Sequence, residues 1–186
     1  MRLFIAAEIA DDTRVQLAAT QDALRVVLDE ARVPPKVTWV DPSLAHVTVR
    51  FIGETSEETA ALVQSALAAV LFHPLSVTWG ALGTFGGNRH PKSIWMGLIA
   101  GQDGFARLVQ DIDARLDPVI RAGRTQPLTP HLTLGRVRDR GRGVDWARAL
   151  QAVTFTPTVT RIEHVTLYQS RLSSKGPTYT AKSRYG

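Results

Sequence analysis

The chain has 186 residues, 44% of them hydrophobic and 21% charged, which is the range of a single globular domain. It contains no cysteine, so disulfides, thiolate nucleophiles and cysteine-ligated metal sites are excluded, and a reducing compartment is favoured. The formal net charge is +5 and arginine supplies 18 of the 22 basic residues, which suits phosphate recognition, although a generally solvated basic surface explains the charge equally well.

Strand and helix patterns alternate along the chain, without a linker or a low-complexity segment. Strand patterns cover residues 3–9, 37–40, 46–52, parts of 75–99, 131–137, 154–160, 162–169 and 178–182. Helix patterns cover residues 11–32, a segment capped by residue 55 or 56, residues 105–116 and residues 144–151. This mixture predicts an α+β fold with antiparallel sheets. With no secretory signal and no apolar run of membrane-spanning length, we expect a cytoplasmic protein without a membrane span.

Three of the five histidines have a threonine two positions later, namely His46, His131 and His164. Threonine occupies 18 of 186 positions, so three such pairs are on the order of a one-in-a-hundred accident. Residues i and i+2 of a strand point to the same face, so the imidazole and the hydroxyl stand side by side while the residues between them point into a core.

The segments that begin at His46 and His131 are similar and lie 85 residues apart, each after a helix and a strand pattern. This repeat predicts two similar lobes that each contribute one strand to a shared cleft. Two such strands would place an acid–base pair around one phosphate, with a threonine hydroxyl on either side. One histidine would deprotonate water and the other would protonate the departing ribose oxygen of a reactive cyclic phosphate, for which no metal is required.

Other chemistries lack their motifs in this sequence. The two glycines at 86–87 are not followed by the Gly-Lys-Ser/Thr of a phosphate-binding loop, and no Gly-x-Ser-x-Gly turn occurs. No histidine pair has the spacing typical of a zinc site. We therefore expect no metal.

The two motifs and their surroundings resemble the 2H phosphoesterases, and within them the bacterial and archaeal RNA 2′,3′-cyclic phosphodiesterases, once described as 2′–5′ RNA ligases. The resemblance covers nearly the whole chain. It rests on RLFIA at 2–6, the segment 39–53 that ends in HVTVRFIG, IWMGL at 94–98, PHLTLGR at 130–136 and the tail from 167 to 179. Val49 stands where the family often has leucine, at a position expected to face the core.

The resemblance implies one bilobal α+β domain over residues 1–186, with two antiparallel-sheet lobes and outer helices around a central cleft. It also implies hydrolysis of RNA 2′,3′-cyclic phosphate ends to 2′-phosphates without a cofactor, with reverse 2′–5′ ligation left open. His46 would act as the proton donor and His131 as the acceptor. The expected partner is RNA with cyclic phosphate ends, tRNA fragments included, and the expected state is a monomer.

The phosphate itself is expected to contact Thr48, Thr133 and two arginines. Strict strand alternation places Arg50 on the same face as His46, where it would clamp phosphate, although a surface ion pair explains it nearly as well. Arg136 matches the arginine that follows the second motif in the family, but strict alternation turns it away from His131 unless a bulge near residue 135 intervenes. The series of arginines at 136, 138, 140 and 142 is either an RNA-backbone track or a solvated loop.

Two alternative functions remain open. A member of the same superfamily could act on a small nucleotide, such as ADP-ribose cyclic phosphate or a 2′–5′ oligonucleotide, and RNA length would then leave its rate unchanged. A non-catalytic protein could hold RNA ends with a steep salt dependence. We interpret His164 as structural, and Phe85, Trp95 and Tyr179 as candidates for stacking on the terminal base.

Overall fold

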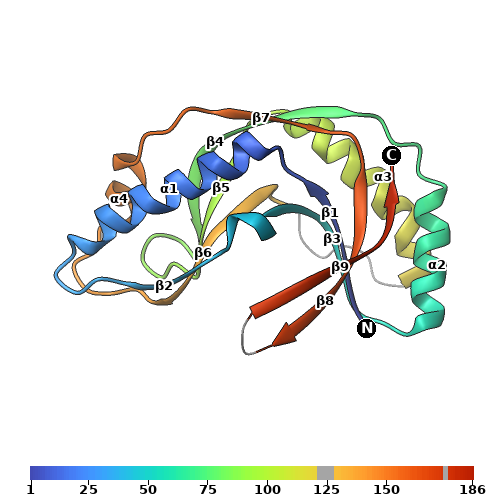
Figure 1. Ribbon diagram of the computed structural model, residues 1–186, viewed down its shortest axis with the longest axis horizontal. Coiled ribbons are helices and arrows are strands. Elements are labelled where there is room, and N and C mark those ends of the chain that lie inside the picture. The colour runs from blue at the N-terminus through green and yellow to red at the C-terminus, as the bar shows by residue number, and fades with distance from the viewer. Residues whose placement is uncertain (121–127, 174–175) are drawn as a thin grey trace.

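The computed structural model describes residues 1–120, 128–173 and 176–186, which form two sheets and four α-helices (Figure 1). The strands are β1 (Arg2–Glu8), β2 (Lys36–Trp39), β3 (His46–Glu54), β4 (Leu75–Phe85), β5 (Ser93–Ala100), β6 (His131–Asp139), β7 (Thr158–Ile162), β8 (Val165–Ser173) and β9 (Gly176–Tyr185). The helices are α1 (Asp11–Asp29), α2 (Glu57–Ala68), α3 (Gln102–Ile120) and α4 (Trp146–Ala152), with a short 3-10 turn η1 (Pro42–Leu44). No helix of the described ranges is both long and apolar enough to cross a membrane.

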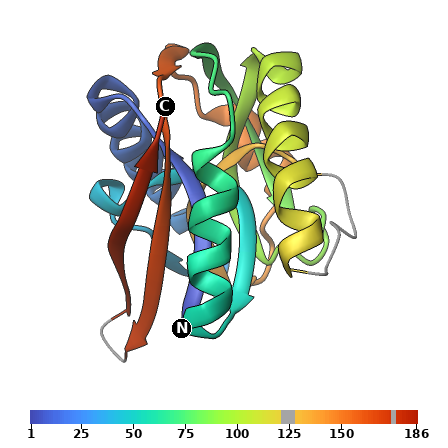
Figure 2. The same ribbon diagram turned by 90° about the vertical axis from the view of Figure 1, so that its right-hand side faces the viewer.

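The two sheets are antiparallel throughout their described pairings. One has four strands in the order β3-β1-β8-β9, and the other has five in the order β2-β6-β5-β4-β7. In Figure 1, α2 and α3 lie with the four-stranded sheet and α1 and α4 with the five-stranded sheet, and Figure 2 shows α2 beside α3. The predicted α+β fold with two lobes of antiparallel sheet and outer helices is confirmed. We refer to the lobe of β3 as lobe 1 and to the lobe of β6 as lobe 2.

Helices α2 and α3 form for the reasons that the sequence indicates. Ser56 is the N-cap of α2, and its side chain accepts a hydrogen bond from the backbone of Thr59, while two glutamates in the first turn suit the helix dipole. Helix α3 buries one apolar stripe with a period of 3.6 residues, made of Phe105, Leu108, Val109, Ile112 and Leu116.

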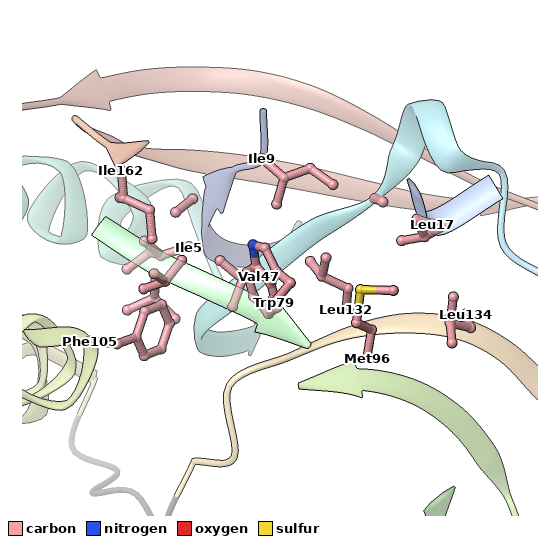
Figure 3. Packing of buried hydrophobic residues seen from close by; sticks show 14 of the residues in the cluster. Ile5, Ile9, Leu17, Val47, Trp79, Met96, Phe105, Leu132, Leu134 and Ile162 are labelled. Atoms are coloured by element: carbon pink, nitrogen blue, oxygen red, sulfur yellow. The ribbon is translucent and has the colours of Figure 1, made fainter. Parts of the chain in front are cut away.

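One cluster of buried hydrophobic residues joins the two sheets. Figure 3 shows Val47 of β3 and Leu132 of β6 pointing into the same cluster as Ile5 and Trp79. Both of these motif residues are 0% exposed, so each motif strand is anchored from behind by the shared core. The relative position of the two motifs is therefore fixed by packing.

The boundaries of two C-terminal strands differ from the prediction. The strand patterns at 154–160 and 162–169 correspond to β7, which ends at Ile162, and β8, which begins at Val165. Glu163 and His164 lie between them, outside any strand. Period-2 alternation continues across such a short break, so the sequence pattern does not reveal it.

Candidate active site

The two motif strands have nearly the same local structure. β3 and β6 are both nine residues long, begin at the motif histidine, and have the same order of buried and exposed positions over their first seven residues. In both strands the pairing register skips one residue just after the motif threonine, Val49 in β3 and Leu134 in β6. The internal repeat expected from the sequence thus includes a β-bulge at the same position in each lobe.

His46 and His131 are held in the same way by the backbone. Nδ1 of His46 lies 2.8 Å from the carbonyl oxygen of Leu44, and Nδ1 of His131 lies 2.7 Å from that of Thr129. A carbonyl oxygen only accepts hydrogen bonds, so Nδ1 carries the proton in each ring. Nε2 of each histidine is then the nitrogen that can exchange a proton with a substrate.

Burial lowers the pKa of both histidines, and the hydrogen bond from Nδ1 to the backbone partly opposes this effect. For His46, the positive charges of His131 and Arg14 lower the pKa further. The strands that carry the two histidines, β3 and β6, contact each other across the two lobes. Without a bound anion both rings are therefore biased toward the neutral form, and a phosphate between them would favour protonation.

Arg14 on α1 supports the backbone that positions His46. Its Nη1 donates at 3.0, 3.1 and 3.0 Å to three carbonyl oxygens of the segment around η1, those of Pro42, Ser43 and Ala45. These contacts fix the turn that carries the Leu44 carbonyl, the acceptor for His46. No pattern in the sequence indicates this role, because these contacts are all to backbone atoms about 30 residues away.

Thr48 and Thr133 lie on the same faces as their histidines, with Ala6 and Trp95 as their partners on the neighbouring strands. Neither hydroxyl has a hydrogen-bond partner among the described residues, so both are free to donate to a phosphate oxygen. We call the surfaces that carry the two His–Thr pairs the histidine face.

The prediction that Arg50 lies on the histidine face is wrong. The bulge at Val49 shifts the alternation by one residue, so Arg50 pairs with Ile5 and turns toward α3. Its guanidinium donates to Asp113 and Asp117 of α3, at 2.8 Å in each case, and the residue is 4% exposed. Arg50 therefore joins β3 to α3.

Arg136 lies on the histidine face for the same reason that Arg50 does not. The bulge at Leu134 shifts the alternation of β6, so Arg136 stands opposite Ser93, two residues from Trp95 on the same face of β5. Burial raises the pKa of Tyr179, and the positive charges of Arg136 and Arg2 partly oppose this effect. The bulge near residue 135, which was the condition for Arg136 to lie on the same face as His131, is therefore present.

The comparisons with known proteins agree with this geometry. Residues 18–173 match the family model of the 2′–5′ RNA ligase superfamily. This chain belongs to that superfamily. A relative from Archaeoglobus fulgidus, named RNA 2′,3′-cyclic phosphodiesterase, is 29% identical over 180 residues, which cover 96% of each chain. A relative of the same name from Methanocaldococcus jannaschii is 25% identical over 182 residues, again 96% of each chain.

Two solved structures have the same fold as this superfamily member. A protein from Thermus thermophilus matches with a TM-score of 0.77 and 25% identity, over 100% of this chain and 97% of its own. E. coli LigT complexed with 3′-AMP matches with a TM-score of 0.73 and 21% identity, over 99% and 96% of the two chains. The 2H phosphoesterase fold that the sequence suggested is thereby confirmed.

Aromatic rings surround the lobe 1 histidine. The ring of His46 lies 5.0 Å from Phe4 and 5.2 Å from Tyr179, with the Tyr179 ring edge-on at 89°. Phe4 in turn stacks on Tyr168 at 5.4 Å. Sequence reasoning proposed Tyr179 but missed Phe4 and Tyr168, because β1 is apolar on both faces and its pattern gives no face assignment.

The lobe 2 histidine has a similar environment. The ring of His131 lies 4.8 Å from Phe85, edge-on at 83°, and 6.5 Å from Trp95. The Trp95 ring lies over Gly83 of β4, so close that a Cβ atom on this glycine would come within 2.3 Å of the ring. The superfamily member thus has aromatic rings beside both histidines, and all three residues proposed for base stacking lie in these two groups.

Gln21 of α1 holds the bulge of β6 in place, a role that sequence reasoning missed. The side chain is buried, with the residue 2% exposed, and its Nε2 donates to the carbonyl oxygens of Val40 and Leu134 at 2.7 and 2.8 Å. Leu134 is the bulged residue, so Gln21 ties down the feature that turns Arg136 toward the histidine face. A glutamine on the buried face of a helix was the available signal.

The third motif, at His164, is built differently from the other two. His164 precedes β8 and contacts Arg184 through its ring nitrogens, while Thr166 is buried at 3% exposure. The Thr166 hydroxyl is therefore inaccessible to a substrate, unlike the threonine hydroxyls of the first two motifs. Glu8 accepts a hydrogen bond from Tyr168 at 3.2 Å and lies 3.8 Å from His164. No three histidine, aspartate or glutamate side chains of the described ranges are grouped as metal ligands.

Proposed function

We propose that this superfamily member hydrolyses RNA 2′,3′-cyclic phosphate ends to 2′-phosphates, using His46 and His131 as proton carriers. The observation that carries the proposal is the repeated strand geometry. Each lobe presents a histidine whose Nδ1 is held by a backbone carbonyl and a threonine hydroxyl on the same face. The curated relatives named RNA 2′,3′-cyclic phosphodiesterase support the choice of substrate.

In the proposed reaction, water attacks phosphorus on the side opposite the ribose O3′. One histidine takes a proton from this water at Nε2, and the other donates a proton from Nε2 to O3′ as the P–O3′ bond breaks. The products are a 2′-phosphomonoester and a free 3′-hydroxyl. The two histidines have then exchanged protonation states, and solvent restores them.

Thr48, Thr133 and Arg136 are the groups proposed to hold the phosphate. The two hydroxyls lie beside the two histidines, and the Arg136 guanidinium can pair with two phosphate oxygens at once. Charge on these oxygens increases as water adds, so donors already in place lower the barrier. Arg50 has no part in this step, since its guanidinium is bound to α3.

The resemblance assigns His46 as the acid and His131 as the base, and a sulfur-substituted substrate tests this order. In a cyclic phosphate whose bridging O3′ is replaced by sulfur, the thiolate leaves without needing a proton. The His46→Ala variant should then recover activity on the sulfur substrate relative to the oxygen substrate, and His131→Ala should not. Recovery by His131→Ala alone would reverse the two roles.

The primary test is turnover, in EDTA, of an RNA that ends in a 2′,3′-cyclic phosphate. We expect the wild type and His164→Ala to form the 2′-phosphate, and His46→Ala and His131→Ala to lose turnover by about 10²- to 10⁴-fold, because each removes a proton carrier. A folded wild type that turns over neither RNA nor a mononucleotide cyclic phosphate, and only binds RNA ends, would replace this proposal with the binding-only alternative.

The same groups also support reverse 2′–5′ ligation. A 5′-hydroxyl in place of water would attack the cyclic phosphate, and the P–O3′ bond would again break to leave a 2′–5′ linkage. The monomeric state, the cytoplasmic location and tRNA fragments as natural substrates stay predictions. Size-exclusion chromatography tests the monomeric state and cell fractionation tests the location. Sequencing of the RNA captured by the His46→Ala variant tests the natural substrate.

A further inference from the structure

We propose that the RNA strand on the 5′ side of the cyclic end leaves the histidine face over one end of lobe 2, where Lys36 and Arg138 contact its backbone phosphates. The inference rests on the proposed function, because it concerns how the same substrate is held. It adds a second contact region that lies outside the catalytic groups.

The register of β2 and β6 connects this region to the histidine face. Arg136 pairs with Thr38 of β2, the edge strand of the five-stranded sheet. Arg138, two residues further along β6, donates from Nε to the Thr38 hydroxyl at 3.2 Å. Its two terminal nitrogens have no hydrogen-bond partner among the described residues. The terminal nitrogens of Arg138 are therefore free to bind a phosphate near the edge of the sheet. Arg138 lies two residues along β6 from Arg136, the arginine proposed to bind the reacting phosphate.

A pocket of about 350 Å³ lies beside Arg138, between α1 and β2. Its charged lining residues are Arg25, Lys36 and Arg138, with Asp29 as the one carboxylate. Lys36 forms no ion pair within the described part of the chain. Arg25 is ion-paired with Asp22 of α1, but Lys36 and Arg138 still outnumber Asp29, so the net charge of the pocket is positive, which suits a phosphate group of a nucleic acid.

The pocket is suited to a phosphate rather than to a stacked base. Trp39 lines it, but the guanidinium of Arg25 lies over that ring, 4.9 Å from its centroid. On the side of β6, a Cβ atom on Gly135 would come within 3.1 Å of the same ring. Arg25 therefore occupies one face of the Trp39 ring, which leaves less of this ring for a base, and the pocket offers mainly charge.

The β4–β5 loop adds cations at the same end of lobe 2. Arg140 donates to the carbonyl oxygen of Arg89 at 3.0 Å and lies 3.2 Å from Nδ1 of His90, so it ties this loop to the end of β6. The backbone of Lys92 bonds to Val137 of β6. Arg138 and Arg140 of the arginine series thus lie at the same end of lobe 2 as Lys36 and this loop.

A comparison of short and long substrates tests the proposal. We would measure kcat/KM for a mononucleotide 2′,3′-cyclic phosphate and for a ten-nucleotide RNA with the same end, over a range of salt concentrations. The Lys36→Ala/Arg138→Ala double variant should lower kcat/KM for the RNA by about 5- to 30-fold, as expected for two exposed phosphate contacts, and leave the mononucleotide unaffected. The slope of log(kcat/KM) against log salt for the RNA should fall by about 1.4, or about 0.7 for each phosphate that is no longer bound.

The matched control is Arg107→Ala/Arg115→Ala, which also removes two positive charges, from exposed positions on α3 in lobe 1. Equal effects of the double variant and of this control on the RNA would overturn the proposal. So would a wild type that processes both substrates with the same kcat/KM and salt dependence, and that result would leave the hydrolase intact and favour the small-nucleotide alternative. If neither substrate were processed, the proposed function would fail. The contact region could then still be tested by fluorescence anisotropy with an RNA that ends in a 2′-phosphate: an affinity of the double variant equal to that of the wild type would overturn the proposed contacts of Lys36 and Arg138.

Discussion

Replacing Arg50 and Arg136 separately by methionine should have opposite effects on stability and catalysis. The two arginines follow equivalent motifs, but the bulges leave Arg50 against α3 and Arg136 on the histidine face. Methionine keeps much of the arginine stem and removes the charge. Arg50→Met should therefore destabilise the fold and spare the chemistry, whereas Arg136→Met should spare the fold and impair the chemistry.

The magnitude for Arg50 follows from the burial of its ion pairs. Its side chain is 5% exposed, and its partners Asp113 and Asp117 are 17% and 40% exposed. Removing one partner of a buried pair costs about 3–5 kcal/mol, and the exposed Asp117 contributes little, so we expect about 3 kcal/mol. For a chain of this length that lowers Tm by about 6–12 °C. Arg136→Met should lower kcat/KM by about 10²-fold, the loss typical of one transition-state donor.

Thermal unfolding of both variants, with kcat/KM measured per folded molecule well below Tm, gives the four numbers needed. A stable Arg50→Met variant with kcat/KM reduced by about 10²-fold would refute the reasoning, since it would mean that Arg50 acts on the substrate. Arg50→Lys serves as a control, because it keeps the charge but cannot bridge two carboxylates with a planar fork. We expect it to recover only part of the lost stability.

Three further predictions concern the groups around the histidines. Gln21→Met should destabilise the fold by about 1–3 kcal/mol in urea unfolding and lower kcat/KM about tenfold or more, since the Leu134 bulge loses a buried donor; an unchanged kcat/KM would contradict a positioning role. The pKa of His46 and of His131 is lowered from the ordinary value of 6.5, so their stabilising contribution is complete above pH 6.5 and lost as pH falls below it. The wild type should therefore have a lower Tm at pH 5 than at pH 7.5, and the His46→Asn/His131→Asn double variant should lose part of that difference. Tyr179→Ala should raise the pKa of His46 toward 6.5 by exposing its ring, which an NMR titration of the His46 ring proton measures; no movement would show that Tyr179 does not bury this ring.

The sequence predicted the two lobes and the histidine–threonine pairs because those features are local. The i, i+2 spacing of His46 and Thr48 sets their common face in any strand, and the apolar residues between them anchor it. The periodicity of α3 is equally local. Aromatic residues near the histidines were only partly found, since Phe4 lies in a strand whose two faces are both apolar.

The features that the sequence did not reveal depend on partners far along the chain. Arg50 was placed on the wrong face because a bulge at Val49 leaves no mark in the residue pattern, and its carboxylate partner Asp113 lies 63 residues away. Gln21 is bonded to Leu134, 113 residues away, so its place on the buried face of α1 singles it out but no local spacing identifies its partner. Long-range hydrogen bonds of this kind decide where a bulge forms, and a single sequence gives no register between distant strands.

The two lobes share a backbone plan but carry different chemistry on it. The bulge turns one residue inward and the next one outward in each strand, which gives Arg50 and Phe51 in β3 and Gly135 and Arg136 in β6. On the histidine face, lobe 1 therefore presents Phe51, which is 65% exposed, where lobe 2 presents a cation. In the proposed reaction the charge that stabilises the phosphate then comes from the side of His131, and it continues from there along β6 toward the edge of lobe 2. The two histidines are placed symmetrically, but Phe51 on β3 and Arg136 on β6 make the two sides of the site different. The positive charge lies on the lobe 2 side, so we expect the rest of an RNA strand to run toward the basic end of lobe 2.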